Sequence, residues 1–301
     1  MSGNGVGISF IMPAYNCSST VRESIDSILN GNLGPDDELV IFEDASRDST
    51  YGVIQSHIEG KENIHLFKHN HNKGGGATRN DAVEMASNDY IFCLDSDNVL
   101  APNSVGALFE HSKAMHADVV SFQELRYFTN TWNATTHTWC FEDVSYDLPY
   151  ILSHNKVPGA SGNYLFTKDS WSRARGYPEF SGALDTWGFG LAQVASGSKM
   201  VILPGTHYYH RYGHESYWVR HSKSQNVSRS ALQLLIPYLD MIEPKDIDYI
   251  MGAGRDQWFS NLDKRPLSLI SSTRSKQSTI LRDILERSFG VTNVILNKMR
   301  T

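Results

Sequence analysis

Three turns in the first hundred residues carry the polar side chains best suited to bind a charged ligand, and each follows an apolar segment. They are Pro13–Asn16, Glu43–Asp48 and Asp95–Asp97. An Asp-x-Asp spacing places both carboxylates on one side of an extended chain, so Asp95 and Asp97 can converge on one hard cation. A divalent cation with open coordination positions can then bind the oxygens of a diphosphate. The alternative is that the two aspartates only cap the turn, because Asp and Ser favour turns.

The acidic pair Glu43–Asp44 also allows two interpretations. One carboxylate could accept the imide N–H of a uracil. Alternatively, both carboxylates only cap the helix expected from Ser49 onward. Ser46 and Asp48 are better explained as loop and cap residues, since short polar side chains are favoured in those positions.

A glycine-rich turn, Asn72–Asn80, runs into a helical pattern. Glycines allow a backbone to approach a ligand closely. Arg79 lies one turn into that helix, where its guanidinium could reach a phosphate. The competing interpretation is a flexible loop followed by a surface arginine.

Alternating strand and helix patterns position these turns. Apolar segments of strand length recur at Ile8–Met12, Glu38–Phe42, Ile64–Phe67, Tyr90–Leu94 and Asp118–Phe122. Helical patterns lie between them, after Thr20–Glu23 (which fits a capping box) and over Ser49–His57, Ala77–Ala86 and Asn103–Met115. Apolar strands alternating with helices indicate an α/β fold with a parallel sheet covered on both faces. Ligands bind such sheets beyond the carboxyl ends of the strands, where the three turns lie.

The pattern changes after Phe122. Residues 123–160 are aromatic and polar with no clear helix, whereas Asn163–Thr167 has a strand pattern and Asp169–Arg175 a short helical one. Helical periodicity returns at 228–240 and 278–289. We therefore expect the α/β domain to end near residue 225 and a helical C-terminal extension to occupy 226–301.

Composition excludes several classes of protein. The chain has 301 residues, 40% of them apolar, and a net charge of −6, which argues against a nucleic-acid binder. Its three cysteines are too few and too scattered for a disulfide framework or a cysteine-based zinc site. The polar start lacks a secretory signal and no apolar run is long enough to span a bilayer, so a cytoplasmic location is expected.

The end of the chain is basic. From Lys264 to Thr301, eight Lys or Arg residues stand against Asp283 and Glu286. A basic amphipathic helix near 280–289 could contact the inner face of a membrane carrying a lipid-linked acceptor. The favoured alternative is that this helix packs on its own domain or on a sister subunit of a homo-oligomer, because an apolar stripe usually faces a core.

Four segments, in order, resemble the family-2 glycosyltransferases, which have the GT-A fold, a Rossmann-like, mostly parallel sheet flanked by helices. They are Ile11–Asn16, Ile41–Thr50, Asn72–Asn80 and Phe92–Asp97. The likeness covers roughly residues 8–220 and implies a nucleotide-binding half (1–122) and an acceptor half (123–225). It also implies hexosyl transfer from a nucleotide sugar, usually a UDP-sugar, to an acceptor hydroxyl, with inversion at the anomeric carbon.

The resemblance assigns roles to residues in these segments. It implies that the base is flanked by Pro13, Ala14 and Tyr15, that Glu43 contacts the uracil and that Arg79 lies near the nucleotide. It further implies that Asp95 lies near the ribose and the metal, and that Asp97 binds Mn²⁺ or Mg²⁺. Their neighbours Asp44 and Ser96 are counted among the nucleotide-sugar-binding residues.

Inverting transfer is a single displacement, so the acceptor hydroxyl needs a base opposite the leaving UDP. The family places its base after a Gly-Tyr/Phe-x-Glu segment, which corresponds here to Gly176–Glu179. Asp185 is therefore the predicted base, although Leu184 stands where the family usually has Glu. Glu179 is the alternative base, and Asp185 could instead cap a helix beginning at Thr186.

The segment His207–Ser216 resembles a late His-Arg-x-x-x-x-Ser stretch of the family. It makes His210 a further candidate metal ligand, while His207 and His214 are better explained as loop or packing residues. Several aromatic side chains could stack on sugars or belong to the core, namely Trp187, Tyr208, Tyr209 and Trp218.

Two other functions fit parts of the pattern. A sugar nucleotidyltransferase would have a basic glycine-rich loop directly after the first strand, where this chain has Pro13–Asn16. A catalytically inactive nucleotide-sugar binding protein would typically lack the metal ligand or the base, whereas Asp97 and Asp185 are both present. The glycosyltransferase is therefore the leading hypothesis.

Overall fold

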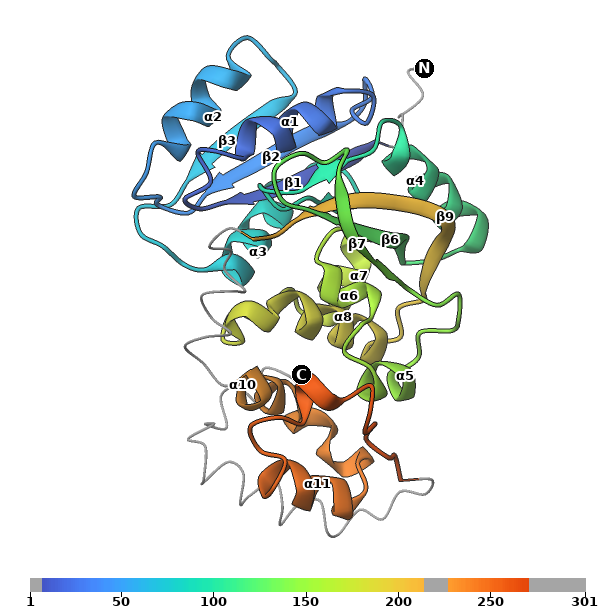
Figure 1. Ribbon diagram of the computed structural model, residues 1–301. Coiled ribbons are helices and arrows are strands. Elements are labelled where there is room, and N and C mark those ends of the chain that lie inside the picture. The colour runs from blue at the N-terminus through green and yellow to red at the C-terminus, as the bar shows by residue number, and fades with distance from the viewer. Residues whose placement is uncertain (1–6, 214–226, 271–301) are drawn as a thin grey trace.

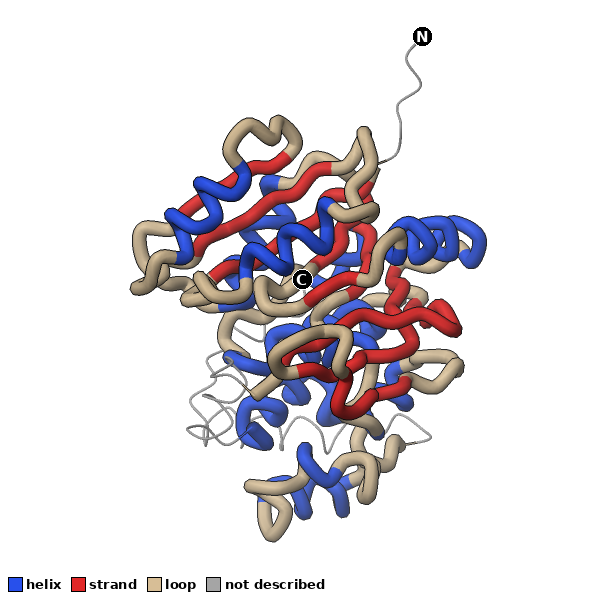
Figure 2. Tube along the Cα trace, turned by 45° about the horizontal axis from the view of Figure 1, so that its top comes forward, coloured by secondary structure: helices blue, strands red, loops and turns tan. Residues whose placement is uncertain are grey.

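The computed structural model describes residues 7–213 and 227–270 (Figure 1). Its centre is a nine-stranded mixed sheet in the order β3-β2-β1-β4-β8-β6-β9-β5, with β7 paired to β6. Helices lie in front of and behind the strands (Figure 2). This is the expected α/β architecture.

The first half of the sheet is parallel. It consists of β1 (Ile8–Ala14), β2 (Glu38–Glu43), β3 (Ile64–Lys68) and β4 (Tyr90–Cys93). Every residue of β2 is buried, as the unbroken apolar segment predicts. The chain passes from β1 to β3 through α1 (Val21–Leu29) and α2 (Thr50–Ile58), and returns to β4 through α3 (Gly75–Met85). Since crossovers are right-handed, this reversal places α3 on the opposite face of the sheet from α1 and α2.

The second half joins the same sheet through antiparallel pairs. Strand β8 (Tyr164–Thr167) lies between β4 and β6 (Val119–Phe128) and is antiparallel to both. Strand β9 (Met200–Arg211) is parallel to β6, and the short β5 (Val99–Leu100) pairs with its far end. The hairpin strand β7 (Thr135–Cys140) and β5 were not predicted, because β7 is almost fully exposed and β5 has only two residues.

Helices of the second half lie below this sheet in Figure 1. They are α5 (Leu148–Ser153), α6 (Pro158–Ser161), α7 (Lys168–Ala174) and α8 (Asp185–Ala195), while α4 (Ser104–Met115) precedes β6. The first two occupy the segment in which no helix was expected. Helix α5 has only six residues, and α6 only four, too few for a periodic signal.

The capping box expected at Thr20–Glu23 is wrong. Helix α1 does begin at Val21, but the Thr20 side chain makes no capping hydrogen bond. The Thr20 hydroxyl donates instead to the carbonyl of Ser96 at 3.0 Å, and the Glu23 carboxylate forms an ion pair with Arg211. Tertiary partners have therefore taken both side chains away from the helix terminus.

The C-terminal helices pack on α8. Helix α10 (Val227–Leu235) continues into a 3₁₀ turn (Ile236–Met241) and is followed by α11 (Pro244–Met251) and a second 3₁₀ turn, Phe259–Asn261. The Trp187 ring of α8 meets the Phe259 ring edge-on at 5.0 Å, and one continuous core includes residues from β1 to Leu267. The domain boundary at 225 remains a prediction, and the helix expected at 278–289 lies outside the described residues.

Within residues 7–213 and 227–270, no helix is both long and apolar enough to cross a bilayer. The expected contact of the basic tail with a membrane lies outside these residues.

Two glycines let the backbones of α6 and α8 touch. A Cβ added at Gly190 would lie 2.6 Å from the Cα of Gly159, and one added at Gly159 would lie 2.8 Å from the Cα of Gly190. The atoms in the way belong to the backbone, so they cannot rotate aside. This contact fixes the position of α8, whose first residue is Asp185.

We expect Gly190→Ala to destabilise the fold by about 1–3 kcal/mol, the usual cost of overpacking a core. The matched control is Gly106→Ala in α4, where an added Cβ meets nothing within 4 Å. That change should stabilise the protein by about 0.5–1 kcal/mol, because alanine restricts the unfolded chain. Urea denaturation of both variants checks the pair; equal effects would contradict the close contact.

Candidate active site

The turns after β1 and β2 are joined at the carboxyl edge of the sheet. The backbone N–H of Asn16 donates to the Ser46 hydroxyl at 2.9 Å, and the Asn16 side chain accepts from the N–H of Arg47 at 2.8 Å. Asn16 and Ala45 both have positive φ, 49° and 55°. Of the predicted base-flanking residues, Pro13 and Ala14 end β1, and Tyr15 is half-buried in the turn. The parallel strands thus bring the two turns together, as expected.

Glu43 and Asp44 occupy different environments in this edge. Glu43 is fully buried; its Oε1 accepts from the N–H of Ser46, and its Oε2 has no partner among the described residues. Asp44 accepts from the N–H groups of Lys73 and Gly74 at 2.8 and 2.9 Å. Neither carboxylate caps α2, since Asp48 accepts from the N–H of Thr50. The helix-cap alternative for this pair is therefore wrong, and Asp48 has the capping role expected of it.

Asp44 also anchors a buried histidine. His69 lies between two carboxylates, with Nδ1 2.7 Å from Asp44 and Nε2 2.7 Å from Asp81 of α3. Together with the bonds to Lys73 and Gly74, this contact holds the glycine-rich turn against the end of β2. The turn is consequently an ordered part of the site edge rather than a flexible loop.

Arg79 joins two carboxylates from distant parts of the chain. Its Nη1 lies 2.7 Å from Oδ2 of Asp185, and its Nη2 lies 2.6 Å from Oδ1 of Asp95. A Cβ added at Gly75 would lie 2.8 Å from the Arg79 Nη1 and 2.9 Å from the Asp185 Oδ2, so a larger residue at this position would have to displace the Arg79–Asp185 ion pair. Arg79 is buried at the site and is not the surface arginine of the competing interpretation.

Burial and charge compete within this triad. Burial raises the pKa of Asp185, and the Arg79 guanidinium opposes that rise. Burial lowers the pKa of Arg79, but Asp185 and then Asp95 outweigh it and hold that pKa well above its ordinary value. Arg79 therefore remains charged and supports the ionised form of a buried carboxylate.

The Asp95–Asp97 turn is held by contacts with Asn163 and with the end of β9. The Asn163 side chain accepts from the N–H of Asp95 at 2.8 Å and donates to its Oδ2 at 3.1 Å. The pairing of Val99 with Tyr209 brings the end of β9 alongside Asp97 and Asn98. Arg211 donates from its N–H to Asn98 Oδ1 at 3.0 Å, so its neighbour His210 lies beside the same turn.

Two residues at this turn are the predicted ligands of a divalent cation. Asp97 offers a carboxylate, the ligand type that suits Mg²⁺ and Mn²⁺, and His210 offers an imidazole, a ligand typical of transition metals rather than of Mg²⁺. Over the ranges that the structure describes, no group of three or more His, Cys, Asp or Glu side chains could hold a metal ion by itself. A cation here would accordingly depend on oxygens of a bound diphosphate to complete its coordination.

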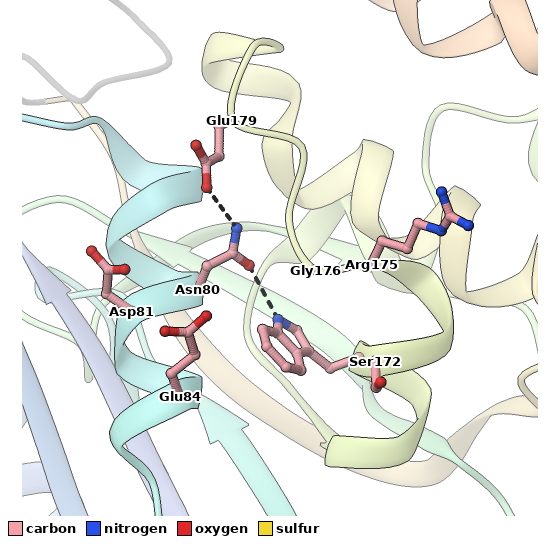
Figure 3. A pocket seen from close by; sticks show the side chains of 8 residues that line it. Asn80, Asp81, Glu84, Ser172, Arg175, Gly176 and Glu179 are labelled. Carbon is pink, nitrogen blue, oxygen red and sulfur yellow. Dashed lines mark hydrogen bonds between the residues drawn. The ribbon is translucent and has the colours of Figure 1, made fainter. Parts of the chain in front are cut away.

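Other predicted residues lie elsewhere. Glu179 accepts from the Asn80 side chain at 3.3 Å and lines a pocket of about 350 Å³ between α3 and α7 (Figure 3). Of the two candidate bases, Asp185 is the one in contact with Arg79. Trp187 and Tyr208 are core residues, whereas Tyr209 packs against Trp132 at 5.1 Å. His214 and Trp218 lie outside the described residues.

Asn163 was not predicted as a site residue. It is fully buried and follows Gly162, which has a positive φ of 74°. A Gly-Asn pair before an apolar strand is the only signal in the sequence, and it equally describes an ordinary turn.

Comparison with known proteins tests the expected family. The model of the family described as glycosyl transferase family 2 matches residues 9–174, more than half of the chain. The chain belongs to this family. The match contains the three polar turns, the glycine-rich turn and the Asn163 that holds Asp95.

Relatives of this family-2 chain include a glucosyltransferase and a synthase. It is 31% identical over 114 residues to a poly(ribitol-phosphate) beta-glucosyltransferase of Bacillus spizizenii, covering 37% of this chain and 18% of that protein. It is 29% identical over 182 residues to chondroitin synthase of Escherichia coli, covering 59% of this chain and 25% of the synthase. The chain thus spans a quarter or less of the length of these two relatives.

Solved structures share the fold of this family-2 chain. Residues 1–349 of S. aureus TarS in complex with UDP-GlcNAc align with a TM-score of 0.63 and 16% identity, over 93% of this chain and 80% of that one. A mannosyltransferase from Pyrobaculum calidifontis, in complex with GDP-Man and Mn²⁺, aligns with a TM-score of 0.54 over 76% of this chain and 61% of that one, at 16% identity. These alignments confirm the expected GT-A fold.

Arg79→Gln should destabilise the fold by about 3–5 kcal/mol near neutral pH, because it leaves two carboxylates without their cation. Without Arg79, burial holds the pKa of Asp185 still further above its unfolded value. Between the unfolded and the folded pKa of Asp185, the folded state keeps the carboxyl proton that the unfolded state loses. The free energy of unfolding therefore falls as pH rises through this range. The loss relative to wild type should be larger at about pH 7.5 than at about pH 4.5 in urea denaturation.

The control for this prediction is Arg173→Gln, which removes an arginine paired with Asp118 and Asp169 on the surface. It should cost about 1 kcal/mol or less at either pH. A loss at Arg79 that matched the control in size and in pH dependence would contradict the charge balance described for the triad.

Proposed function

We propose that this family-2 protein is a metal-dependent, inverting glycosyltransferase that moves a hexosyl group from a UDP-sugar to a hydroxyl of a glycan or lipid-linked acceptor. The observation that carries the proposal is the Arg79-linked pair of Asp95 and Asp185 at the carboxyl edge of the sheet. Asp95 follows β4 in the nucleotide-binding half, and Asp185 begins α8 in the acceptor half. The nucleotide-sugar donor and the acceptor hydroxyl would therefore meet at this triad.

The nucleotide half offers groups that suit a uridine. The buried Oε2 of Glu43 has no partner among the described residues, and a uracil imide N–H would satisfy it. Pro13, Ala14 and Tyr15 border the same turn. Fold neighbours are consistent with this assignment, since TarS was crystallised with UDP and with UDP-GlcNAc.

Asp97 and His210 would hold the cation, and Ser96 and Asp95 would border the ribose. When bound, Mn²⁺ or Mg²⁺ would stabilise the negative charge that develops on the departing diphosphate. The mannosyltransferase that shares the fold was crystallised with Mn²⁺. In this arrangement Asp44 would support the nucleotide site indirectly, because its oxygens accept hydrogen bonds from the backbone of the glycine-rich turn.

Asp185 would act as the base. Its carboxylate would accept the proton of the acceptor hydroxyl while that oxygen bonds to the anomeric carbon and the bond to UDP breaks. Arg79 would keep the carboxylate ionised and oriented in a buried position. Leu184, which stands where the family usually has Glu, leaves Asp185 as the acidic residue of that pair.

The acceptor would approach across the strands of the second half. Tyr127 stacks on His137 at 4.3 Å and lies 4.8 Å from His210, so aromatic rings lead from the proposed cation site to the edge of β7. Such rings suit the apolar faces of sugars. A lipid-linked acceptor, a membrane contact and a homo-oligomer were inferred from the basic tail, most of which lies beyond the described residues. They are further parts of the proposal.

UDP release from a panel of UDP-sugars tests the reaction. With Mn²⁺ present we expect release from at least one donor and its loss after EDTA treatment. Nucleotide binding without any turnover, including slow hydrolysis, would instead favour a binding protein.

Asp97→Ala should abolish the metal-dependent part of UDP binding, because it removes a carboxylate ligand of the cation. Calorimetric titration with UDP, with and without Mn²⁺, measures this directly. An affinity equal to that of wild type in both titrations would remove Asp97 from the site.

Asp185→Asn should lower kcat by about 10²–10⁴-fold while leaving donor affinity nearly intact, because it removes the proton acceptor at equal size and leaves Arg79 paired with Asp95. The matched variant is Glu179→Gln, which should retain turnover if Asp185 is the base. Loss of donor affinity, turnover and thermal stability together in Asp185→Asn would make Asp185 a structural residue.

A further inference from the structure

The peptide groups on both sides of Asp97 are gripped by side chains from elsewhere in the chain. The hydroxyl of Thr20, just before α1, donates to the carbonyl of Ser96 at 3.0 Å and lies 3.3 Å from that of Cys17. The Nε of Arg211, at the end of β9, donates to the carbonyl of Asp97 at 3.0 Å. One contact holds the peptide before the Asp97 Cα, and the other holds the peptide after it.

Arg211 is itself fixed on every side. Its Nη1 donates to the carbonyl of Thr129 at 3.2 Å, and its Nη2 forms an ion pair with Glu23. The guanidinium lies 4.5 Å from the centre of the Phe128 ring, and the side chain is only 10% exposed. All three guanidinium nitrogens have protein partners, so Arg211 is placed to hold the turn rather than to bind a phosphate.

Thr20 and Glu23 lie one helical turn apart and have the sequence of a capping box, yet neither caps α1. Thr20 contacts the Asp95–Asp97 turn directly, and Glu23 contacts it through Arg211. We define these three residues, Thr20, Glu23 and Arg211, as the turn clamp.

We propose that the turn clamp positions the Asp97 carboxylate for the divalent cation; this inference rests on the proposed metal-dependent function. Each residue has two soft backbone dihedrals, and fixing both flanking peptide planes fixes both of them. The direction of the Asp97 Cα–Cβ bond is then set before any ligand arrives. A cation with few protein ligands depends strongly on such orientation of the ligands that it has.

The clamp also relates the two predicted metal ligands to each other. Arg211 directly follows His210, and its backbone N–H donates to the Asn98 side chain while its Nε donates to Asp97. The same arginine thereby fixes the position of the His210 backbone relative to the Asp97 turn. Thr20, Glu23 and Arg211 are accordingly positioning residues, since none of them needs to touch the cation or the donor.

The test compares Thr20→Val, which removes the hydroxyl at nearly equal size, with Thr20→Ser, which retains it. Mn²⁺ binding is measured in the presence of UDP, by calorimetry and by the electron paramagnetic resonance signal of free Mn²⁺. Thr20→Val should bind Mn²⁺ about 3- to 10-fold more weakly, the effect of losing one hydrogen bond, and Thr20→Ser should bind like wild type. Raising the Mn²⁺ concentration should restore UDP release in Thr20→Val.

Arg211→Lys provides a second test, because lysine keeps the charge opposite Glu23 but lacks the planar fork. We expect Mn²⁺ affinity to fall by about tenfold or more, since several charge-assisted contacts are lost together. Its matched control is Arg173→Lys, at the end of α7. Arg173 also has three protein partners, one carbonyl and two carboxylates, but lies away from the Asp97 turn. The control should leave Mn²⁺ affinity unchanged, whatever its effect on thermal stability.

The outcomes separate the clamp from the function on which it rests. If wild type binds Mn²⁺ with UDP and both Thr20→Val and Arg211→Lys bind it equally well, the clamp is structural only and the proposal fails. The same conclusion follows if Thr20→Ser loses as much affinity as Thr20→Val. If wild type binds no Mn²⁺ even with UDP, the metal-dependent function fails first, and the clamp proposal fails with it.

Discussion

The site depends on one buried cation between two carboxylates. Arg79 contacts Asp95 and Asp185 at 2.6 and 2.7 Å, although these two aspartates are 90 positions apart, one in the turn after β4 and the other at the start of α8. Without the guanidinium, two negative charges would share a poorly solvated space, which is costly. The neighbouring backbone is adapted to this arrangement, since Gly75 leaves room for the pair and Asn163 holds Asp95 from the other side.

Several side chains around the triad form hydrogen bonds with the backbone of neighbouring turns. Asp44 orders the glycine-rich turn that leads to Arg79, and Thr20 and Arg211 order the turn that contains Asp97. Residues that would contact a nucleotide sugar or cation are thus surrounded by residues that determine where they point. Asp44 contributes to the site in this way, since its carboxylate accepts hydrogen bonds from the backbone of Lys73 and Gly74.

The sequence was sufficient to predict which polar turns lie at the carboxyl edge of the sheet. It was not sufficient to predict the side-chain contacts between distant segments at that edge. Apolar strands followed by Pro13–Asn16, Glu43–Asp48 and Asp95–Asp97 predicted where the turns meet, because parallel strands end at a common edge. The Thr20-x-x-Glu23 pattern predicted a helix cap and was misleading, because its partner Arg211 lies 188 residues beyond Glu23. Local patterns carry no information about such partners, and the same limit applies to Asn163 and to the short strands β5 and β7.

Strand β8 has a mechanical consequence. It is hydrogen-bonded to β4 on one side and to β6 on the other, so the two halves of the molecule share one uninterrupted ladder. They cannot rotate about a hinge between them, as two-domain enzymes do, without breaking backbone hydrogen bonds in the interior. The loops at the carboxyl edge of the sheet must therefore align donor and acceptor. Sequence differences that change substrate choice should accumulate in those loops, while the strands of the ladder stay constant.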